Sequence, residues 1–196
     1  MRVAVLGIRF SPLSSILRGF GCWVIEYEAP IDIVQLEAHS IDFAVSYRYR
    51  HIVQKPVIDY LKDHIINLHI SFLPWNRGAD PNLWSFLEDT PRGVTIHYID
   101  EGIDTGDIIA QREVAFPAAG ETLRFTYDRL NDEIVALFKE QWPLIMRGEA
   151  SRQKQPPGGS FHRTTDKRPY EGLLAERGWD TRIEVVTGKA LRDSGA

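Results

Sequence analysis

The residues best placed to do chemistry lie in one stretch of the chain, from Ile65 to Asp107. After the apolar pair Ile65-Ile66, polar and aliphatic side chains alternate over residues 67–71, so Asn67 and His69 fall on the same face of a predicted β-strand. An amide and a protonated imidazole on one face can both donate hydrogen bonds to an oxyanion that forms when a carbonyl is attacked. The pattern therefore indicates a reaction at a carbonyl carbon.

A carboxylate follows in the polar loop after the next predicted strand, residues 94–99, where Asp104 lies between two glycines. A carboxylate beside an imidazole can keep the ring charged, orient it, or take a proton from an incoming amine. Two structural alternatives remain open. A histidine on a strand is often only a hydrogen-bonding partner of the fold, and an aspartate in a glycine-flanked loop is often only a turn residue.

An ordered set of short motifs surrounds these residues and comprises Asn67, His69, Ser71, Leu73-Pro74, Arg77-Gly78, Gly93-Val94-Thr95, His97 and Asp104-Thr105-Gly106. Together they resemble the catalytic core of the folate-dependent formyltransferases. That family includes glycinamide ribonucleotide formyltransferase, methionyl-tRNA formyltransferase and the sugar-nucleotide N-formyltransferases. The resemblance implies that Asn67, His69 and Asp104 are the catalytic residues, and that 10-formyltetrahydrofolate is the formyl donor.

Two further segments, residues 74–84 and Phe161-His162-Arg163, are most similar to the sugar-nucleotide enzymes. This implies that the acceptor is the primary amine of a nucleotide-linked amino-deoxy sugar. Flat aromatic rings and polar groups of this stretch suit a sugar or a base, and a loop arginine suits a phosphate. The candidate substrate-binding residues are Arg9, Trp75, Asn76, Arg77, Asn82 and Trp84. The alternatives are that the tryptophans belong to the core and that the loop arginine is merely solvated.

The folate is expected beside loops at the carboxyl ends of strands, where open α/β sheets bind ligands. By resemblance, one loop follows the strand at residues 41–46 and the other follows the strand at residues 94–99. The candidate cofactor-binding residues are Tyr49, Arg50, Ile52, Asp100, Glu101 and Gly102. For the tyrosine and arginine side chains, a stacked surface cluster is the alternative.

Other acceptors remain open: glycinamide ribonucleotide, methionyl-tRNA or a natural-product amine. The glycine-rich phosphate loop of the purine-pathway enzyme is missing after Leu6, and the chain is too short for the extra domain of the tRNA enzyme. A net charge of −4 gives no general electrostatic case for nucleic acid. A non-catalytic folate- or nucleotide-sugar-binding protein is a further alternative, against which the intact Asn67, His69 and Asp104 argue.

The order of predicted elements indicates an α/β fold, with a Rossmann-like, mixed but mostly parallel sheet and flanking helices. Strands are predicted at residues 3–6, 23–27, 41–46, 66–71, 94–99 and 108–114, and helices near 13–20, 31–39, 56–63, 81–87 and 120–147. The loop that carries Asp104 is too short for a helical crossover, so the strands on either side should be antiparallel. No Gly-x-Gly-x-x-Gly follows the first strand, which leaves a dinucleotide site unsupported.

The 196 residues are 43% hydrophobic and 26% charged, as in a soluble globular protein. We expect a catalytic domain at residues 1–149 and a C-terminal extension at 150–196, which packs on that domain or on a second subunit of a homodimer. Within the extension, residues 181–186 alternate like a strand. The single cysteine, Cys22, allows no internal disulfide, and no motif indicates a metal. The apolar run at residues 1–7 is too short for a signal peptide or a membrane span, so a cytoplasmic location without a membrane partner is expected.

Overall fold

The structure is a computed structural model that describes residues 1–116 and 120–191. The described residues pack as two compact units. The first unit comprises Met1–His69, Ile96–Ala110 and Val135–Lys154, and the second comprises the described parts of Ile70–Thr95, Gln111–Ile134 and Gln155–Ala196. Each unit is therefore built from three segments that alternate along the chain. The expected domains, in contrast, meet at a single boundary after residue 149. Residues 192–196 of the expected extension lie outside the described residues.

Among the described residues, a six-stranded sheet has the order β2-β1-β3-β4-β6-β7. Its strands are β1 (Arg2–Gly7), β2 (Trp23–Tyr27), β3 (Phe43–Tyr47), β4 (Ile65–His69), β6 (Gly93–Tyr98) and β7 (Ile108–Glu113). β1 pairs in parallel with β2 and β3, and β3 pairs in parallel with β4. The N–H of Tyr98 donates to the carbonyl of Asp107 at 2.9 Å, and the N–H of Val114 donates to that of Arg92 at 2.9 Å. Because the residue numbers run in opposite directions, β6 and β7 are antiparallel, and the predicted mixed sheet is confirmed.

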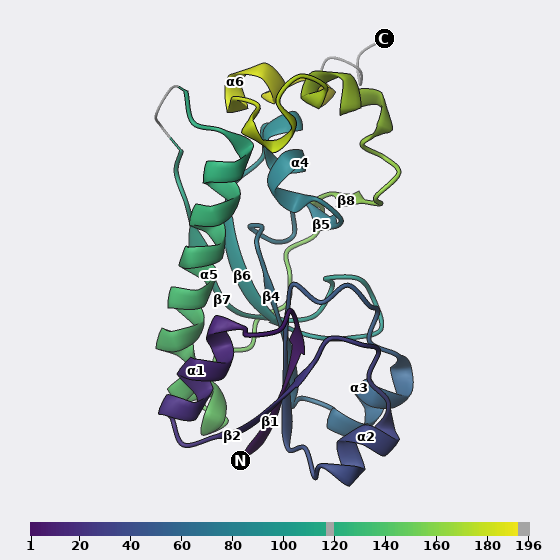
Figure 1. The fold of residues 1–196 in the computed structure, drawn as a ribbon, viewed down its shortest axis with the longest axis vertical. Coiled ribbons are helices and arrows are strands. Elements are labelled where there is room, and N and C mark those ends of the chain that lie inside the picture. The colour runs from purple at the N-terminus through teal and green to yellow at the C-terminus, as the bar shows by residue number, and fades with distance from the viewer. Residues whose placement is uncertain (117–119, 192–196) are drawn as a thin grey trace. The chain divides into compact units, whose positions relative to one another are not determined.

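The first unit places helices on both faces of its strands. In Figure 1, α2 (Ile33–Ala38) and α3 (Lys55–Leu61) lie on one side of β1 and α1 (Pro12–Gly19) lies on the other. α1 begins as predicted, because Ser11 Oγ accepts a hydrogen bond from the N–H of Leu13 at 3.3 Å and Pro12 takes the first helical position. Under α2 and α3 lies a hydrophobic core made of Ala4, Leu6, Tyr27, Ile31, Leu36, Ile41, Ala44, Val57, Leu61 and Ile65.

The part of α5 (Leu123–Met146) that belongs to the first unit supplies large aromatic side chains. Trp142 and Phe138 are fully buried, and the rings of Phe43 and Trp142 meet edge to face with centroids 5.3 Å apart. The apolar face of α5 in this unit is therefore part of the core.

In the second unit, the C-terminal segment shares a core with α4 (Pro81–Leu87). Its elements are β5 (Arg77–Gly78) paired in parallel with β8 (Phe161–His162), the 3-10 helices η1 (Arg168–Leu174) and η2 (Gly178–Asp180), and α6 (Ile183–Val186). The common core contains Leu83, Trp84, Phe86, Leu87, Leu123, Ile183 and Val186.

The strand expected at residues 181–186 is wrong, because this segment ends in the helical turn α6. Ile183 and Val186 are 7% and 0% exposed, whereas Val185 between them is 43% exposed. A spacing of three residues puts two side chains on one face of a helix. Over so short a run, alternation and a single helical turn give nearly the same pattern of apolar residues.

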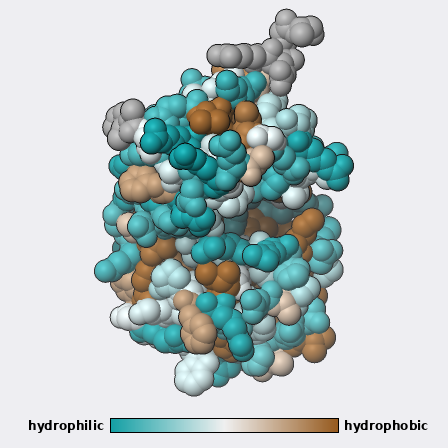
Figure 2. Space-filling model, turned by 45° about the horizontal axis from the view of Figure 1, so that its top comes forward, coloured by the Kyte–Doolittle hydropathy of each residue, from teal (hydrophilic) through white to brown (hydrophobic). Residues whose placement is uncertain are grey.

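The surface drawn in Figure 2 is mostly hydrophilic, with apolar residues in separate places. Among the described residues, the large apolar side chains with the highest exposure are Phe10, at 91%, Val34, at 72%, and Trp23 and Ile52, each at 70%. Within residues 1–116 and 120–191, no helix combines the length and the apolar character that crossing a membrane requires.

Candidate active site

β4 carries the amide and the imidazole of the site. It lies inside the sheet next to β3, with Asn67 opposite Ser46. Side chains two residues apart on a strand point to the same face, so Asn67 and His69 lie together while Leu68 points into the opposite side. His69 is only 7% exposed.

Asp104 comes from the loop between β6 and β7 and reaches both of these side chains. Its Oδ1 accepts a hydrogen bond from Asn67 Nδ2 at 3.1 Å, and its Oδ2 lies 3.7 Å from His69 Nδ1. The Asp104 side chain is 13% exposed, and its backbone has a φ of 54°. L residues occupy this left-handed region rarely, although aspartate tolerates it better than most. The structure thus brings together the three residues expected to be catalytic.

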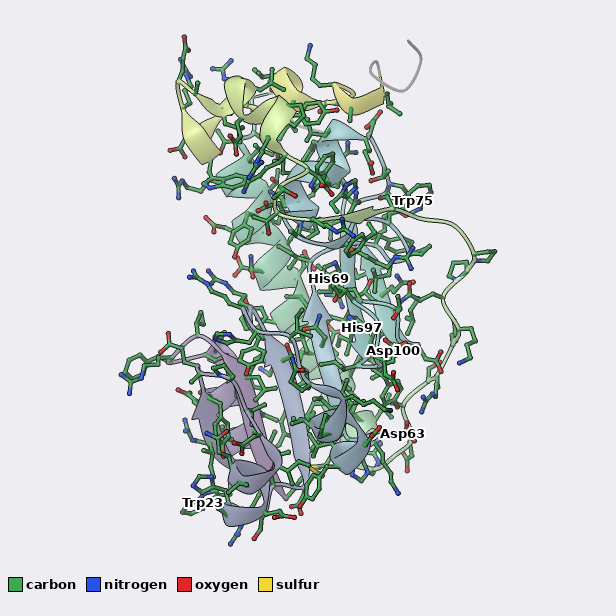
Figure 3. All side chains as sticks on the ribbon, turned by 90° about the vertical axis from the view of Figure 1, so that its right-hand side faces the viewer. Trp23, Asp63, His69, Trp75, His97 and Asp100 are labelled. Carbon is green, nitrogen blue, oxygen red and sulfur yellow. The ribbon has the colours of Figure 1, made fainter. Side chains whose placement is uncertain are left out.

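His97 on β6 is a fourth member of the cluster. Its Nδ1–H donates to the carbonyl of Tyr98 at 2.7 Å, and its Nε2 lies 3.2 Å from Asn67 Nδ2 and 3.4 Å from Asp104 Oδ1. Figure 3 shows His69 and His97 next to each other, and their ring centroids are 6.3 Å apart. The sequence motif includes His97, but its spacing alone indicates no role for it. The sequence could not reveal that the His97 side chain is only 2% exposed, on a strand that lies between β4 and β7.

The loop that carries Asp104 is held by its own side chains. The Asp100 carboxylate accepts from the N–H of Gly102 at 3.1 Å and from Thr105 Oγ1 at 2.6 Å. At Gly106 there is no space for a side chain, because a Cβ would lie 1.9 Å from the carbonyl oxygen of Tyr98. The expected folate contacts Asp100 and Gly102 therefore shape this loop.

Glu101 and the segment after β3 complete the expected folate region of the first unit. Glu101 is exposed and pairs with Lys55. The Tyr49 hydroxyl donates to the carbonyl of Ala29 at 2.9 Å and accepts from the N–H of Ile31 at 3.1 Å, and burial raises the pKa of this phenol. Arg50 is exposed and Ile52 is 70% exposed, so a guanidinium group and an apolar side chain face the solvent here.

In the loop between β1 and α1, a backbone N–H donates a hydrogen bond to a side-chain carboxylate of the protein itself. The N–H of Phe10 donates to Glu26 Oε2 at 3.1 Å, and Ser14 Oγ donates to the other oxygen of Glu26. Helix N-termini and the loops before them commonly bind phosphate in α/β proteins. Here Glu26 provides the negative charge. Arg9, a candidate substrate contact, is exposed in this loop.

In the second unit, residues 75–77 lead into the short strand β5, which begins at Arg77. Trp75 is half-buried, whereas Asn76 is fully buried. The amide of Asn76 donates to Glu88 Oε2 at 3.4 Å and accepts from Thr90 Oγ1 at 2.8 Å. Arg77 donates to the carbonyls of Ser160 and Gly158 at 3.4 Å and 3.3 Å.

The two candidates on α4 are also buried in the second unit. Asn82 Nδ2 donates to the carbonyl of Leu123 at 2.9 Å, and its Oδ1 accepts from Thr126 Oγ1 at 3.1 Å. Trp84 is 5% exposed and stacks on His162 with ring centroids 3.7 Å apart. These placements favour supporting roles for both residues, in line with the core alternative.

Taken together, the cluster on β4 and β6 offers donors for an oxyanion and a carboxylate for a proton. Asn67 supplies amide N–H groups, and Asp104 lies beside His69, where a carboxylate can balance the charge of an imidazolium. In the described part of the chain, no group of three or more His, Cys, Asp or Glu side chains is placed to hold a metal ion.

Comparison with known proteins agrees with this chemistry. The family model for formyl transferase matches residues 28–141. The chain is similar to the crystal structure of the formyltransferase PseJ from Anoxybacillus kamchatkensis in complex with UDP-4,6-dideoxy-4-formamido-L-AltNAc and tetrahydrofolate. The two are 48% identical with a TM-score of 0.92, covering 97% of this chain and 100% of that one.

Curated relatives include two methionyl-tRNA formyltransferases. The one from Syntrophus aciditrophicus is 33% identical over 79% of this chain and 48% of its own length. The one from Fusobacterium nucleatum is 38% identical over 63% of this chain and 40% of its own length. The chain thus spans about half the length of the curated relatives it matches.

Proposed function

The chain belongs to the formyl transferase family, and on this premise we propose that it is an N-formyltransferase that uses 10-formyltetrahydrofolate. The proposed acceptor is the primary amine of a nucleotide-linked amino-deoxy sugar. The observation that carries the proposal is the position of Asp104, which bonds Asn67 and faces His69 at 3.7 Å. That arrangement combines oxyanion donors with a proton acceptor at one point.

In the proposed mechanism, Asp104 accepts a proton as the amine nitrogen forms its bond to the formyl carbon. Asn67 Nδ2 and the His69 imidazolium donate to the formyl oxygen as negative charge develops on it. Until it takes up this proton, the Asp104 carboxylate balances the charge on His69. When bound, 10-formyltetrahydrofolate would supply the formyl group, and its nitrogen would leave with the proton that Asp104 has taken from the amine. Folate contacts are proposed for Tyr49, Arg50, Ile52, Asp100, Glu101 and Gly102.

The fit of these residues to a folate rests on the first unit. Ile52 offers exposed apolar surface for a flat ring, and Arg50 offers a charge for a carboxylate. The loop of Asp100 and Gly102 is held rigid and leads directly to Asp104. Rigid loops next to the reacting groups are suited to positioning a co-substrate.

We propose UDP-linked 4-amino-4,6-dideoxy-L-AltNAc as the specific acceptor. The similar protein PseJ was crystallised with the 4-formamido form of this sugar, which is the amine after formyl transfer. An identity of 48% along 97% of this chain supports the same acceptor here. Arg9 and Trp75, which are exposed and half-buried, are the candidate substrate contacts that remain open to a ligand.

Methionyl-tRNA is the second candidate acceptor, because curated relatives with that name are 33% and 38% identical. The net charge of −4 disfavours it, since a tRNA substrate requires positive surface. Glycinamide ribonucleotide is disfavoured because Glu26 already provides an anion at the loop after β1. The cytoplasmic location and the homodimer remain expectations.

The test is a panel of amines incubated with 10-formyltetrahydrofolate, in which the absorbance change on tetrahydrofolate formation is followed. The panel contains the UDP-linked amino sugar, a thymidine-diphosphate amino sugar, glycinamide ribonucleotide and methionyl-tRNA. We expect turnover on the UDP-linked sugar. Turnover on methionyl-tRNA or glycinamide ribonucleotide with none on any amino sugar would overturn the acceptor, and no turnover on any amine would overturn the activity.

A further inference from the structure

One arginine from a distant part of the chain closes the base of the loop that carries Asp104. Arg152 follows α5, and its Nε donates to Asp107 Oδ2 at 2.8 Å while Nη1 donates to Asp63 Oδ1 at 2.6 Å. Its guanidinium also lies over the Tyr98 ring, 4.5 Å from the centroid. Tyr98 and Asp107 flank the loop, and Asp63 lies two residues before β4. One side chain therefore contacts both ends of the Asp104 loop and the turn that leads into β4.

The backbone around Arg152 is fixed at the same place. The N–H of Ile108 donates to the carbonyl of Gln153 at 2.7 Å, and the N–H of Gln153 donates back to Ile108 at 2.9 Å. The N–H of Tyr98 donates to the carbonyl of Asp107 at 2.9 Å. Arg152 is thus held beside the loop by the residue next to it, and the loop is closed by a hydrogen bond between its own ends.

From this geometry we propose that Arg152 is a positioning residue for formyl transfer, an inference that rests on the proposed function. It holds the ends of the loop so that Asp104 stays within reach of Asn67 and His69. Its own contacts are with Asp107, Asp63 and Tyr98, so it acts through the loop. A displacement of a reacting group by about 1 Å can lower the rate on the order of 100-fold. Contacts that fix the ends of the Asp104 loop can therefore affect catalysis.

The exposures of the partners indicate what Arg152 contributes. Its side chain is 47% exposed and that of Asp63 is 69% exposed, so this ion pair adds little to the stability of the fold. Asp107 is only 11% exposed, and Arg152 together with Lys154 holds the pKa of its carboxyl below the usual range. A guanidinium can bridge two carboxylates and lie flat on a ring at once, which an ammonium cannot. We therefore expect the loss of Arg152 to affect catalysis more than stability.

The experiment compares Arg152→Ala and Arg152→Lys with wild type for kcat and for the KM of the folate and of the UDP-linked amino sugar. The control is Arg147→Ala, since Arg147 lies near the same helix end and pairs with Glu149 on the surface at 2.8 Å. We expect Arg152→Ala to lower kcat by about 10-fold or more with both KM values nearly unchanged. Arg152→Lys should recover part of the loss, and Arg147→Ala should behave as wild type.

Amide hydrogen exchange provides a readout that does not require activity. In Arg152→Ala, amides of residues 99–107 should exchange faster than in wild type, while those of β3 should not change. An unchanged kcat in a folded Arg152→Ala protein, or unchanged exchange in the loop, would overturn the proposal. A lower Tm with an unchanged kcat would assign Arg152 a purely structural role.

If Arg152→Ala does not fold, the same measurements are made on Arg152→Lys and Asp107→Asn, because each variant weakens the interaction between residues 152 and 107. If wild type transfers formyl to no amine, the proposed function fails. The exchange result then still decides whether Arg152 holds the loop, so the two failures can be told apart.

Discussion

At the scale of single residues, the site depends on how the two N–H groups of Asn67 are used. Its Nδ2 lies 3.1 Å from Asp104 Oδ1 and 3.2 Å from His97 Nε2. The amide nitrogen therefore lies within hydrogen-bonding distance of both side chains. These two neighbours orient the amide whose N–H groups are proposed to donate to the oxyanion.

The first prediction concerns the proposed catalytic residues. Asn67→Ala, His69→Ala and Asp104→Ala should each lower kcat by about 100-fold or more, the usual worth of oxyanion donors and acid–base groups. Steady-state kinetics with the UDP-linked amino sugar provides the measurement. His64→Gln is the control, because His64 is exposed and stacks on Phe43 outside the cluster. Wild-type kcat in a folded variant would remove that residue from the mechanism.

The second prediction concerns His97. Replacing it with leucine removes the neighbour of Asn67 Nδ2 and Asp104 Oδ1, so both side chains lose part of their orientation. We expect kcat to fall by about 10-fold, a smaller loss than for the catalytic residues, with KM nearly unchanged. A rise in KM without a change in kcat would instead indicate a role in substrate binding.

At the scale of elements, the turn between β6 and β7 tolerates no side chain at Gly106. A Cβ there would lie 1.9 Å from the backbone oxygen of Tyr98, so the loop must shift and Asp104 shifts with it. Gly106→Ala should therefore lower kcat by about 10- to 100-fold. Gly172→Ala is the matched control, since a Cβ there meets no atom within 4 Å. Equal kinetics for the two variants would show that the loop adapts without cost.

The hydrogen bonds of Asn82 join α4 to the start of α5 within the second unit. Its amide bonds the carbonyl of Leu123 and the hydroxyl of Thr126 at 2.9 Å and 3.1 Å, and the residue is 4% exposed. Asn82→Ala leaves buried groups unpaired, which should destabilise the protein by about 1–3 kcal/mol in urea unfolding. An unchanged free energy of unfolding together with a higher KM for the sugar would instead support the role of Asn82 as a direct substrate contact, as expected from the sequence.

At the scale of the whole molecule, stability should fall on both sides of neutral pH. Arg152 and Lys154 lower the pKa of Asp107, and Arg124 lowers that of Asp180, from ordinary values of 3.8. The stabilisation from these carboxylates is present above the unfolded value and is lost as the pH falls through the lower folded value. Thermal unfolding of wild type and Asp107→Asn should therefore differ above pH 3.8 and converge below it.

At alkaline pH the buried phenols have the opposite effect. Burial raises the pKa values of Tyr27, Tyr49 and Tyr98 above 10.0, so the folded state keeps protons that the unfolded chain releases. Their stabilisation is complete below pH 10.0 and is lost as the pH rises through the folded values. A Tm that stays constant from neutral pH to well above 10 would contradict this.

The sequence by itself determined the elements and the identity of the cluster. Alternation over residues 67–71 placed Asn67 and His69 on one face, and the short loop after β6 required an antiparallel partner strand. These are local properties, because side-chain direction repeats every second residue in any strand. Periodicity over a few residues was less reliable, as the helical turn α6 shows.

Only the tertiary structure decided which polar side chains remain open to a ligand. Asn76 and Asn82 resemble substrate contacts in the sequence, yet their amides are used by Glu88, Thr90, Leu123 and Thr126. The contribution of Arg152 to the Asp104 loop was equally hidden, since its partner Asp63 is 89 positions away. The chemical type of a side chain is written in the sequence, but whether its hydrogen bonds are already made depends on neighbours that are distant along the chain.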